Sequence, residues 1–528
     1  MVKVLVSDKL SPHGLEILKS AGLQVDFKTG LKPEELKKII SQYEALVIRS
    51  SSQVTADILE AADKLQVIGR AGIGVDNVDL PAASKKGIVV MNTPSGNAVT
   101  TAEHAIAMMF AVSRKIPQAT ASLRSGKWEK GKFMGSELCN KVLGIVGVGN
   151  IGKIVADRAL GLKMRVVGYD PFLSEEAAQK LGIQLATLDD IFARADYITV
   201  HTPLNEKTKN LIGKGAFTKM KKGVYIINCA RGGIVNEIDL MNAIKEGIVA
   251  GAALDVFEKE PPAPDHPLLQ MEQVIFTPHL GAATDEAQEN VAIEIAEQIA
   301  DYFKTGTIRN AVNFPSISAE ARAFLQPYIS LAEKLGSLQG QLVEKLPSEL
   351  LIEYRGDITG RSLSPVTIGF LKGLLSHMLS DVSVNYVNAP VIAQERGMKV
   401  IESKIREHAD FANLMTVTLK SGQESFSVSG TIFGKTNPRI VRIDDFYLEA
   451  VPEGKILVIH NHDRPGVIGN IGTLLGQKKV NISRMQLGME KGGSEAMALY
   501  NVEGNITPDV IVQIEKLPNI ISVKVVDL

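Results

Sequence analysis

Short apolar runs alternate with amphipathic stretches along the first part of the chain. The runs that predict strands are VKVLVSD, EALVIRS, KLQVIGRAG and GIVVMNTP, and intervening stretches such as SPHGLEILKSAG have helical spacing. Short strands that alternate with helices favour an α/β fold with a mostly parallel sheet. A longer helical pattern runs from Thr100 to about Leu123, and Pro117 predicts a bend within it.

The α/β pattern then restarts with more strongly apolar runs. Buried strands are predicted at KVLGIVGVG, RVVGYD, YITVHTP, VYIINCARG, AGAALDVF and VIFTPHLG, and a long helix is expected from Thr284 to about Lys304. The alternation stops around residues 314–318 (FPSIS), so we place a domain boundary there.

The rest of the chain has two parts with different patterns. Residues 319–452 mix helices with the strand LLIEYRGD and the strand pair MTVTLKSGQESFSVSGTIFG, which indicates an α+β segment. After the short linker AVPEGK, the elements follow the order strand, helix, strand, strand, helix, strand. This βαββαβ order is typical of a ferredoxin-like unit.

Composition and charge narrow the class of protein. A chain of 528 residues favours three or four domains. Its 58 basic and 59 acidic side chains argue against a general nucleic-acid binder, although they allow a local basic pocket. The chain has two cysteines, Cys139 and Cys229, and no apolar run approaches the ~20 residues of a membrane span. We therefore expect a cytoplasmic protein without a disulfide framework.

A glycine-rich turn predicts a dinucleotide site. Gly147, Gly149 and Gly152 form G-V-G-N-I-G between a strand and a helix, and Asp170 ends the next strand. The glycines allow a tight turn, close approach of a pyrophosphate and close helix–strand contact, while the Asp170 carboxylate suits ribose hydroxyls and favours NAD over NADP. The alternative is a glycine-rich turn that binds nothing. A second cluster, GRAGIGVDN at 69–77, opens no helix and is an ordinary loop unless substrate binds there.

Three polar residues follow predicted buried strands and are candidates for catalysis. Arg231 ends YIINCARGG, Glu260 lies just past AALDVF, and His279 lies in TPHLGAAT. Parallel strands bring their carboxyl ends to the same ligand crevice, where a base, a carboxylate to tune it and a cation could act together. Taken singly, each residue is better explained as a salt bridge or a loop residue.

These motifs resemble those of the long-form D-3-phosphoglycerate dehydrogenase family, within the D-isomer-specific 2-hydroxyacid dehydrogenases. The stretches that carry the resemblance are GRAGIGVDNVD, MNTPSGNAVTTAEH, LGIVGVGNIG, VGYDP, HTPL, NCARGGIVNE, GAALDVFEKEPP and TPHLGAAT. The resemblance implies that His279 is the general acid/base, that Glu260 pairs with it, and that Arg231 fixes the substrate carboxylate. It also implies an NAD site whose further contacts are Asn150, Ile151, Thr202, Cys229, Ala230, Asp255 and Gly281.

The phosphorylated end of a substrate would meet the first domain of such an enzyme. The resemblance places Arg49, Arg70 and Asn97 there, and both arginines end predicted strands, so their charges would converge. The alternative is that they are exposed surface arginines.

The C-terminal unit resembles an ACT domain, which binds amino acids at dimer interfaces. HNHDRPGVIGNIGTLL and VNIS carry this resemblance; Asn461, Asp463 and Asn481 would then contact an effector, with L-serine implied. His460 and His462 lack the companions of a metal site, so no metal is expected. Lys435, Arg439 and Arg442 could hold an anion, although a solvated run of charges explains them better.

These observations together predict a four-domain enzyme. A Rossmann-type doubly wound parallel sheet domain (100–284) is inserted in a flavodoxin-like α/β substrate domain (1–99 and 285–315), and an α+β intervening domain (316–452) and a ferredoxin-like ACT domain (453–528) follow. The resemblance implies NAD-dependent oxidation of 3-phospho-D-glycerate with serine feedback in a homotetramer, and no nucleic-acid or membrane partner is expected. The alternatives are another D-2-hydroxyacid dehydrogenase, such as a glyoxylate or hydroxypyruvate reductase, and a non-enzymatic NAD-sensing scaffold.

Overall fold

The computed structural model describes residues 1–315, 319–379, 382–407, 410–490 and 493–528. The chain divides into two compact units, Met1–Gln53, Ile68–Asn77 and Met91–Asn310 in the first, and Val54–Val67, Val78–Val90 and Ala311–Leu528 in the second. The boundary predicted at 314–318 falls largely on residues 316–318, which lie outside the described residues. The four domain limits therefore stay predictions.

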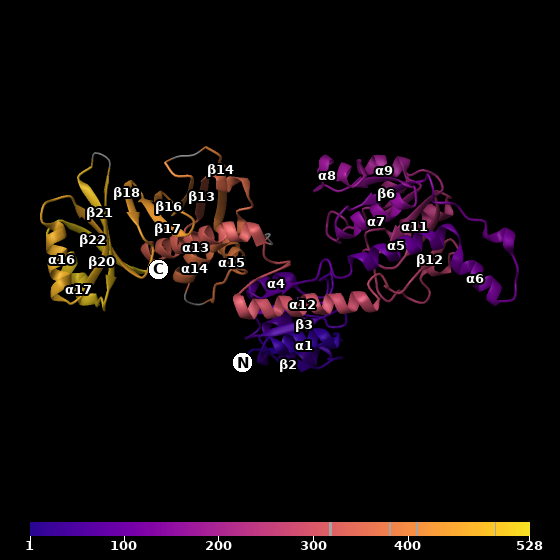
Figure 1. The fold of residues 1–528 in the computed structure, drawn as a ribbon, viewed down its shortest axis with the longest axis horizontal. Helices are drawn as coiled ribbons and strands as arrows, with labels where there is room; N and C mark the ends of the chain where they lie inside the picture. Colours follow the sequence, from indigo (N-terminus) through magenta and orange to yellow (C-terminus); the bar gives the residue numbers. More distant parts are fainter. Residues whose placement is uncertain (316–318, 380–381, 408–409, 491–492) are drawn as a thin grey trace. The chain divides into compact units, whose positions relative to one another are not determined.

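The N-terminal sheet has five strands in the order β2-β1-β3-β4-β5. It is drawn in indigo in Figure 1, where β2 and β3 are labelled. β1 pairs in parallel with both β2 and β3. The sequence patterns missed β2, because its side chains are exposed or half-buried and it lacks an apolar run. The elements are β1 (Lys3–Val6), α1 (Pro12–Ser20), β2 (Gln24–Phe27), α2 (Pro33–Ile39), η1 (Ile40–Gln42), β3 (Ala45–Ile48), α3 (Ala56–Glu60), β4 (Val67–Arg70), α4 (Leu80–Lys85) and β5 (Val89–Met91).

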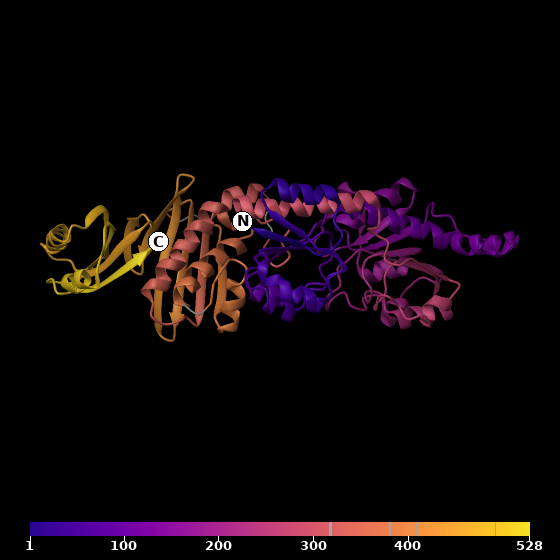
Figure 2. The ribbon, with the colours of Figure 1, turned by 90° about the horizontal axis from the view of Figure 1, so that it is seen from below.

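A helix from much later in the chain completes this region. α12 (Asp285–Thr305) packs along α1, and the two helices lie side by side (Figure 2). A Cβ on Gly69 of β4 would lie 2.7 Å from the Ile295 side chain, so α12 also packs closely over the sheet. Asn92 donates its backbone N–H to the Asn310 carbonyl, which anchors the chain after the helix.

The second sheet has seven strands in the order β12-β11-β10-β9-β6-β7-β8, and each pair is parallel. α5, α7 and α8 share an apolar core with one face of the sheet, and α9, α10 and α11 share another core with the opposite face. This arrangement confirms the doubly wound Rossmann-type domain. The elements are β6 (Val142–Val146), α7 (Asn150–Gly161), β7 (Arg165–Tyr169), α8 (Glu175–Lys180), β8 (Gln184–Leu185), α9 (Leu188–Arg194), β9 (Tyr197–Val200), α10 (Lys214–Phe217), β10 (Val224–Asn228), α11 (Glu237–Lys245), β11 (Val249–Leu254), η3 (Pro267–Gln270) and β12 (Val274–Phe276).

The long helix predicted from Thr100 to Leu123 is two helices, α5 (Ala98–Ser113) and α6 (Ile116–Arg124), followed by η2 (Lys130–Phe133). The break lies at Arg114 and Lys115, where Lys115 has φ +51°, and not at Pro117 as predicted. Pro117 is in the first turn of α6, where a proline costs no hydrogen bond. No residue of α6 is buried.

The C-terminal part forms one mixed sheet of ten strands, in the order β14-β13-β15-β16-β17-β18-β20-β21-β19-β22. The predicted βαββαβ order is confirmed from β19 to β22. The sequence did not indicate that β18 pairs with β20, which joins the ferredoxin-like unit to the preceding segment in a single sheet. The elements are α13 (Ala319–Leu342), β13 (Glu349–Gly356), η4 (Asp357–Gly360), α14 (Ser364–Met378), α15 (Ala389–Glu395), β14 (Lys399–Ile405), β15 (Asn413–Ser421), β16 (Glu424–Phe433), β17 (Asn437–Ile443), β18 (Phe446–Ala450), β19 (Lys455–His462), α16 (Val467–Gln477), β20 (Asn481–Glu490), β21 (Glu495–Glu503), α17 (Pro508–Glu515) and β22 (Ile520–Asp527).

Two glycines let α13 and α14 pack backbone against backbone. A Cβ on Gly373 would lie 2.0 Å from the Glu333 carbonyl oxygen, and one on Gly336 would lie 2.2 Å from the Phe370 carbonyl oxygen. Among the described residues, no helix is both long and apolar enough to cross a membrane.

Candidate functional site

The glycine-rich turn between β6 and α7 has the geometry of a phosphate site. Gly147 has φ +94°, a conformation that side chains disfavour, and a Cβ there would lie 2.7 Å from the His201 carbonyl oxygen. A Cβ on Gly152 would lie 2.1 Å from the Gly147 carbonyl oxygen, so this glycine allows close packing. A Cβ on Gly149, at the start of α7, would meet no described atom within 4 Å, which leaves the helix N-terminus open to an anion.

Other predicted cofactor residues surround this turn. Asp170 follows β7, and its carboxylate accepts the Val148 N–H at 2.9 Å, which ties it to the glycine turn. The buried Thr202 hydroxyl has no hydrogen-bond partner in the described part of the chain and could serve a ligand. Asn150 and Ile151 open α7, and the Asn150 amide donates to the Pro94 carbonyl at 3.2 Å. The open glycine turn, the carboxylate and the unpaired hydroxyl together fit NAD.

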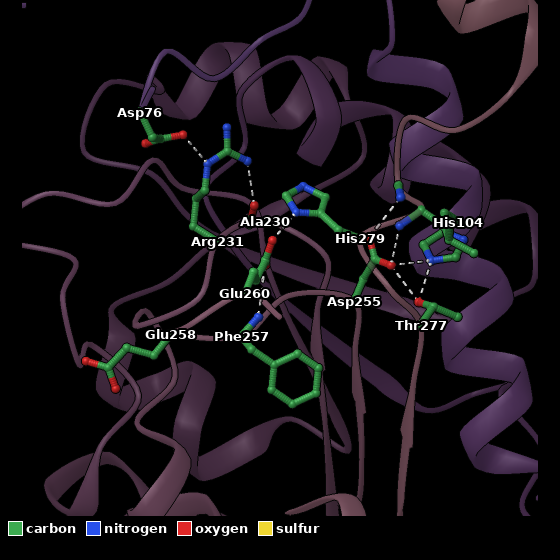
Figure 3. Close-up of polar contacts among 12 residues, drawn as sticks. Asp76, His104, Ala230, Arg231, Asp255, Phe257, Glu258, Glu260, Thr277 and His279 are labelled. Atoms are coloured by element: carbon green, nitrogen blue, oxygen red, sulfur yellow. Dashed lines mark hydrogen bonds and ion pairs between the residues drawn. The ribbon is translucent and has the colours of Figure 1, made fainter. Parts of the chain in front are cut away.

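His279 and Glu260 form the predicted pair. The His279 Nδ1 lies 2.7 Å from the Glu260 Oε2, and the Phe257 N–H donates to the Glu260 Oε1 at 3.1 Å (Figure 3). Because the neighbouring acceptor fixes the proton on Nδ1, the Nε2 of neutral His279 is free to take a proton. Both side chains are partly exposed, so a substrate can reach them.

The two groups shift each other's pKa in opposite directions. The hydrogen bond to Glu260 raises the pKa of His279 above its usual value, although burial opposes this. Burial raises the pKa of the Glu260 carboxyl, but the hydrogen bonds from His279 and the Phe257 N–H outweigh burial and hold that pKa below its usual value. The carboxylate therefore stays charged and stabilises the imidazolium.

Arg231 contacts an acidic residue that the sequence patterns missed. Its Nε donates to the Asp76 Oδ2 at 2.9 Å, and its Nη1 donates to the Ala230 carbonyl at 2.7 Å (Figure 3). Asp76 lies in GRAGIGVDN, so this loop belongs to the site although it fails the dinucleotide fingerprint. A Cβ on Gly74 of the same loop would lie 1.7 Å from the Arg231 Nη2, so the guanidinium rests directly on the loop.

The structure brings Arg49 and Arg70 near Arg231. Burial, together with the positive charges of Arg231 and Arg49, lowers the pKa of Arg70 to about 10. The buried Arg70 Nε has no hydrogen-bond partner among the described residues. Arg49 is held at the end of β3, where its backbone N–H donates to the Asp8 Oδ2 at 2.6 Å. These arginines are therefore not isolated surface residues.

Asn97 belongs to the same compact unit as these arginines. It precedes α5 as the N-cap residue, is 8% exposed, and its Oδ1 has no hydrogen-bond partner in the described ranges. A buried amide oxygen without a donor is available to a ligand hydroxyl.

Asp255 lies at the centre of a hydrogen-bond network rather than facing an open site. Its Oδ1 accepts the Leu280 N–H and the Thr277 hydroxyl, and its Oδ2 accepts the Gly281 N–H. His104 contacts the same carboxylate, with its Nε2 3.2 Å from the Oδ1. His104 lies within the helical pattern predicted from Thr100, which by itself assigns it no role; only its contacts with residues far along the chain reveal one.

Cys229 and Ala230 follow β10 and are buried beside this network. Burial raises the pKa of the Cys229 thiol, which therefore stays protonated. The Ala230 N–H donates to the Asn228 Oδ1 at 3.0 Å, which shapes the turn that leads into Arg231. The Ala230 contact helps to position the strand end, and the predicted contacts of Cys229 and Ala230 with NAD stay predictions.

The candidate effector residues lie on β19, just past it and on β20. Asn461 is 3% exposed; its amide donates to the His462 carbonyl, and its Oδ1 has no partner among the described residues. Asp463 is exposed, and the Asn481 amide lies 3.3 Å from the Glu503 Oε2. No hydrogen bond joins Asn461, Asp463 and Asn481 to one another within the described ranges.

The histidine pair and the basic cluster also have local partners. The His460 Nε2 lies 2.7 Å from the Glu495 Oε2, and no group of three or more His, Cys, Asp or Glu able to hold a metal occurs among the described residues. The Arg439 guanidinium lies over the Phe433 ring, with its Cζ 5.5 Å from the ring centroid. Nothing here separates an anion site at Lys435, Arg439 and Arg442 from the solvated run of charges that the sequence favours.

Comparison with known proteins gives the class of protein. Residues 106–281 match the NAD binding domain of D-isomer specific 2-hydroxyacid dehydrogenases. A glyoxylate reductase from Paecilomyes thermophila aligns with a TM-score of 0.55 and 28% identity, covering 59% of this chain and 98% of that one. The D-lactate dehydrogenase from Aquifex aeolicus, solved with NAD and lactic acid, aligns with a TM-score of 0.52 and 27% identity, covering 60% and 100%. The chain is an NAD-dependent oxidoreductase of this class.

Full-length relatives then give the family. The chain is 44% identical to the D-3-phosphoglycerate dehydrogenase of Archaeoglobus fulgidus and 40% identical to that of Bacillus subtilis, each over 529 residues that cover 100% of both chains. Residues 324–444 match the D-3-phosphoglycerate dehydrogenase intervening domain. The chain belongs to the D-3-phosphoglycerate dehydrogenase family.

Proposed function

We propose that this chain oxidises 3-phospho-D-glycerate to 3-phosphohydroxypyruvate with NAD, the first step of L-serine biosynthesis. The proposal rests on three arginines, Arg49, Arg70 and Arg231, which lie close enough for the charges of the other two to lower the pKa of Arg70. All three belong to the same compact unit as the predicted catalytic pair, His279 and Glu260. A small 2-hydroxy acid with a carboxylate at one end and a phosphate at the other would form ion pairs with all three arginines. The names of the full-length relatives support the same substrate.

Each residue of the site has its own role in the proposed reaction. Arg231 binds the substrate carboxylate, and a guanidinium fork suits its two oxygens. The Nε2 of His279 takes the hydroxyl proton while the C–H hydride leaves, so the alcohol carbon becomes a ketone. NAD, when bound, accepts the hydride. Glu260 stabilises the imidazolium that forms and keeps its Nδ1–H in place.

Arg49 and Arg70 bind the phosphate end in this proposal. The pKa of Arg70 is lowered because it is buried beside two other cations, an arrangement that is unfavourable without an anion. A phosphate contributes roughly two negative charges and offsets that repulsion. An unphosphorylated hydroxy acid does not offset the repulsion between these arginines. The site should therefore bind the phosphorylated acid more tightly.

A substrate panel tests this proposal against the other dehydrogenases. Purified protein is assayed with NAD and 3-phosphoglycerate, glycerate and lactate, and in reverse with NADH and glyoxylate or hydroxypyruvate. We expect kcat/KM to be highest for the phosphorylated acid. Equal or higher values for an unphosphorylated acid would support another D-2-hydroxyacid dehydrogenase instead.

His279→Ala separates an enzyme from an NAD-sensing scaffold. We expect turnover to fall by roughly a thousandfold or more, because the variant lacks the group that takes the proton. NAD affinity, measured by calorimetry, should stay near the wild-type value. Wild-type protein that binds NAD but turns over no acid of the panel would favour the scaffold.

Serine feedback is a further part of the proposal. The βαββαβ unit and the unpaired, buried Asn461 Oδ1 support an amino-acid site there. We expect millimolar L-serine to lower the rate and raise the thermal midpoint, because a ligand that favours one state shifts the equilibrium to it. Asp463→Ala should abolish both effects without changing the basal rate. If serine leaves the wild type unchanged, the unit does not regulate this chain.

We also propose that the chain forms a homotetramer and that it is located in the cytoplasm. Apolar side chains are exposed on α6 and the segment after it, including Trp128 at 82% and Met134 at 78%, and such a surface suits contact with a second copy. Light scattering on the full chain gives the state, and Trp128→Glu should reduce the measured mass. The cytoplasmic location is inferred from the low cysteine content.

A further inference from the structure

The turn that carries His279 is held by the carboxylate of Asp255. This carboxylate, 1% exposed, accepts the N–H groups of Leu280 at 2.7 Å and Gly281 at 2.8 Å. The His279 N–H donates to the backbone carbonyl of Asp255 at 2.9 Å. His279 has φ +55°, a conformation that a residue with a side chain keeps only when its surroundings hold it. The position of the base therefore depends on Asp255.

His104 on α5 contacts the same carboxylate, at the Oδ1 that also accepts the Leu280 N–H. Its Nε2 lies 3.2 Å from the Asp255 Oδ1 and 3.1 Å from the Thr277 Oγ1 (Figure 3). The Thr277 hydroxyl donates its hydrogen to Asp255 at 2.5 Å, so it faces His104 as an acceptor. Both neighbours of Nε2 are acceptors, and Nε2 therefore carries a hydrogen and donates it. His104 supplies the side-chain N–H that a buried carboxylate needs.

The same helix begins at another predicted part of the site. Asn97, predicted to contact substrate, is the N-cap residue of α5, and His104 lies seven residues later, about two turns along the same face. Thr101, between them, lies against the turn: a Cβ on Gly281 would be 3.5 Å from its Cγ2. α5 therefore connects the substrate end of the site to the turn that holds the base.

We propose that His104 is a positioning residue for the reaction: it holds the Asp255 carboxylate and the Thr277 hydroxyl, and so fixes the turn from which His279 reaches the substrate. This inference rests on the proposed role of His279 as the base. Burial favours the neutral form of Asp255, but the hydrogen bonds from His104 and Thr277 hold the pKa of its carboxyl below the usual value, which is consistent with an ionised acceptor. His104 itself touches neither substrate nor NAD in this scheme.

Two substitutions separate positioning from simple packing. His104→Leu removes the N–H donor, whereas His104→Gln keeps an N–H donor on a side chain of similar reach. We expect His104→Leu to lower kcat by roughly tenfold to a hundredfold, because a misplaced base loses alignment, with a much smaller change in KM. His104→Gln should recover most of the rate. His13→Gln, in an exposed pair with Glu289, is the matched control and should behave as wild type.

A chemical measurement makes the test independent of turnover. Diethylpyrocarbonate modifies accessible imidazoles, and mass spectrometry follows the peptides that contain His279 and His13. In His104→Leu the labelling rate of His279 should rise as the turn loosens, while the rate at His13 stays unchanged as an internal standard. Unchanged labelling and kcat in His104→Leu would overturn the inference, and so would a loss that His104→Gln fails to recover. A wild type inactive on the whole panel refutes the proposed function, and the labelling still decides the role of His104.

Discussion

The Glu260 carboxylate determines at which pH the His279 base works. Oxidation needs neutral His279, so kcat/KM should rise as pH increases through the pKa of this imidazole, which the hydrogen bond to Glu260 raises above its usual value. Glu260→Gln removes the negative charge and lowers that pKa, so the rise should move to lower pH. The maximal rate should fall roughly tenfold or more, because the amide stabilises the imidazolium less.

Glu258→Gln is the control for this pH experiment, since the Glu258 side chain points away from His279 (Figure 3). Its pH profile should overlay that of the wild type. A Glu260→Gln profile that keeps the wild-type midpoint would contradict the assignment of His279 and Glu260 as a coupled pair. In the reductive direction, which needs protonated His279, the same substitution should make the rate fall at a lower pH.

Single residues were predictable where local sequence sets their position. His279, Glu260 and Arg231 each follow a buried parallel strand, and such strands bring their carboxyl ends together. Asp76 and His104 were not predictable in this way. Their partners, Arg231 and Asp255, are far along the chain, and only the folded structure brings these pairs into contact.

At the scale of elements, the crossing of α13 and α14 should be highly sensitive to added volume. Gly373→Ala places a Cβ against the Glu333 carbonyl, and overpacking of this kind typically costs about 1–3 kcal/mol. The thermal midpoint of the variant, measured by calorimetry, should therefore fall. The NAD affinity at 25 °C should not change, because Gly373 lies in the other compact unit.

Gly472→Ala is the matched control, since Gly472 is within a helix and a Cβ there meets no described atom within 4 Å. It should leave the midpoint unchanged or raise it, because alanine favours a helix by up to about 1 kcal/mol over glycine. Equal midpoints for both variants would contradict close contact between α13 and α14.

Strands with a strong apolar run were predicted, whereas very short, exposed or isolated ones were not. The six apolar strands of the seven-stranded sheet are confirmed, whereas β8, with two residues, leaves no pattern. β14 is exposed or half-buried along its length and also lacks an apolar run. The pairing of β18 with β20 depends on contacts far apart in sequence, which hydrophobic spacing does not report.

At the scale of the whole molecule, a net charge of −1 conceals local cations at the site. Arg49, Arg70 and Arg231 should attract a phosphorylated acid at short range, and salt screens such attraction over roughly 8–10 Å at physiological strength. The KM for 3-phosphoglycerate should therefore rise several-fold between about 0.05 and 0.5 M salt. The KM for glycerate should rise less. Parallel salt dependence of the two would contradict a phosphate site at these arginines.

The late position of α12 has a consequence for synthesis of the chain. α12 packs along α1 and over β4, and the contact between Asn92 and Asn310 follows it. A nascent chain leaves the ribosome from its N-terminus, so the first strands emerge long before this helix does. The seven-stranded sheet can form meanwhile, because its residues are contiguous. Until α12 is synthesised, an apolar face of the N-terminal sheet stays exposed to solvent. If a ribosome stalled near residue 280, that face would remain exposed and chaperones could bind it.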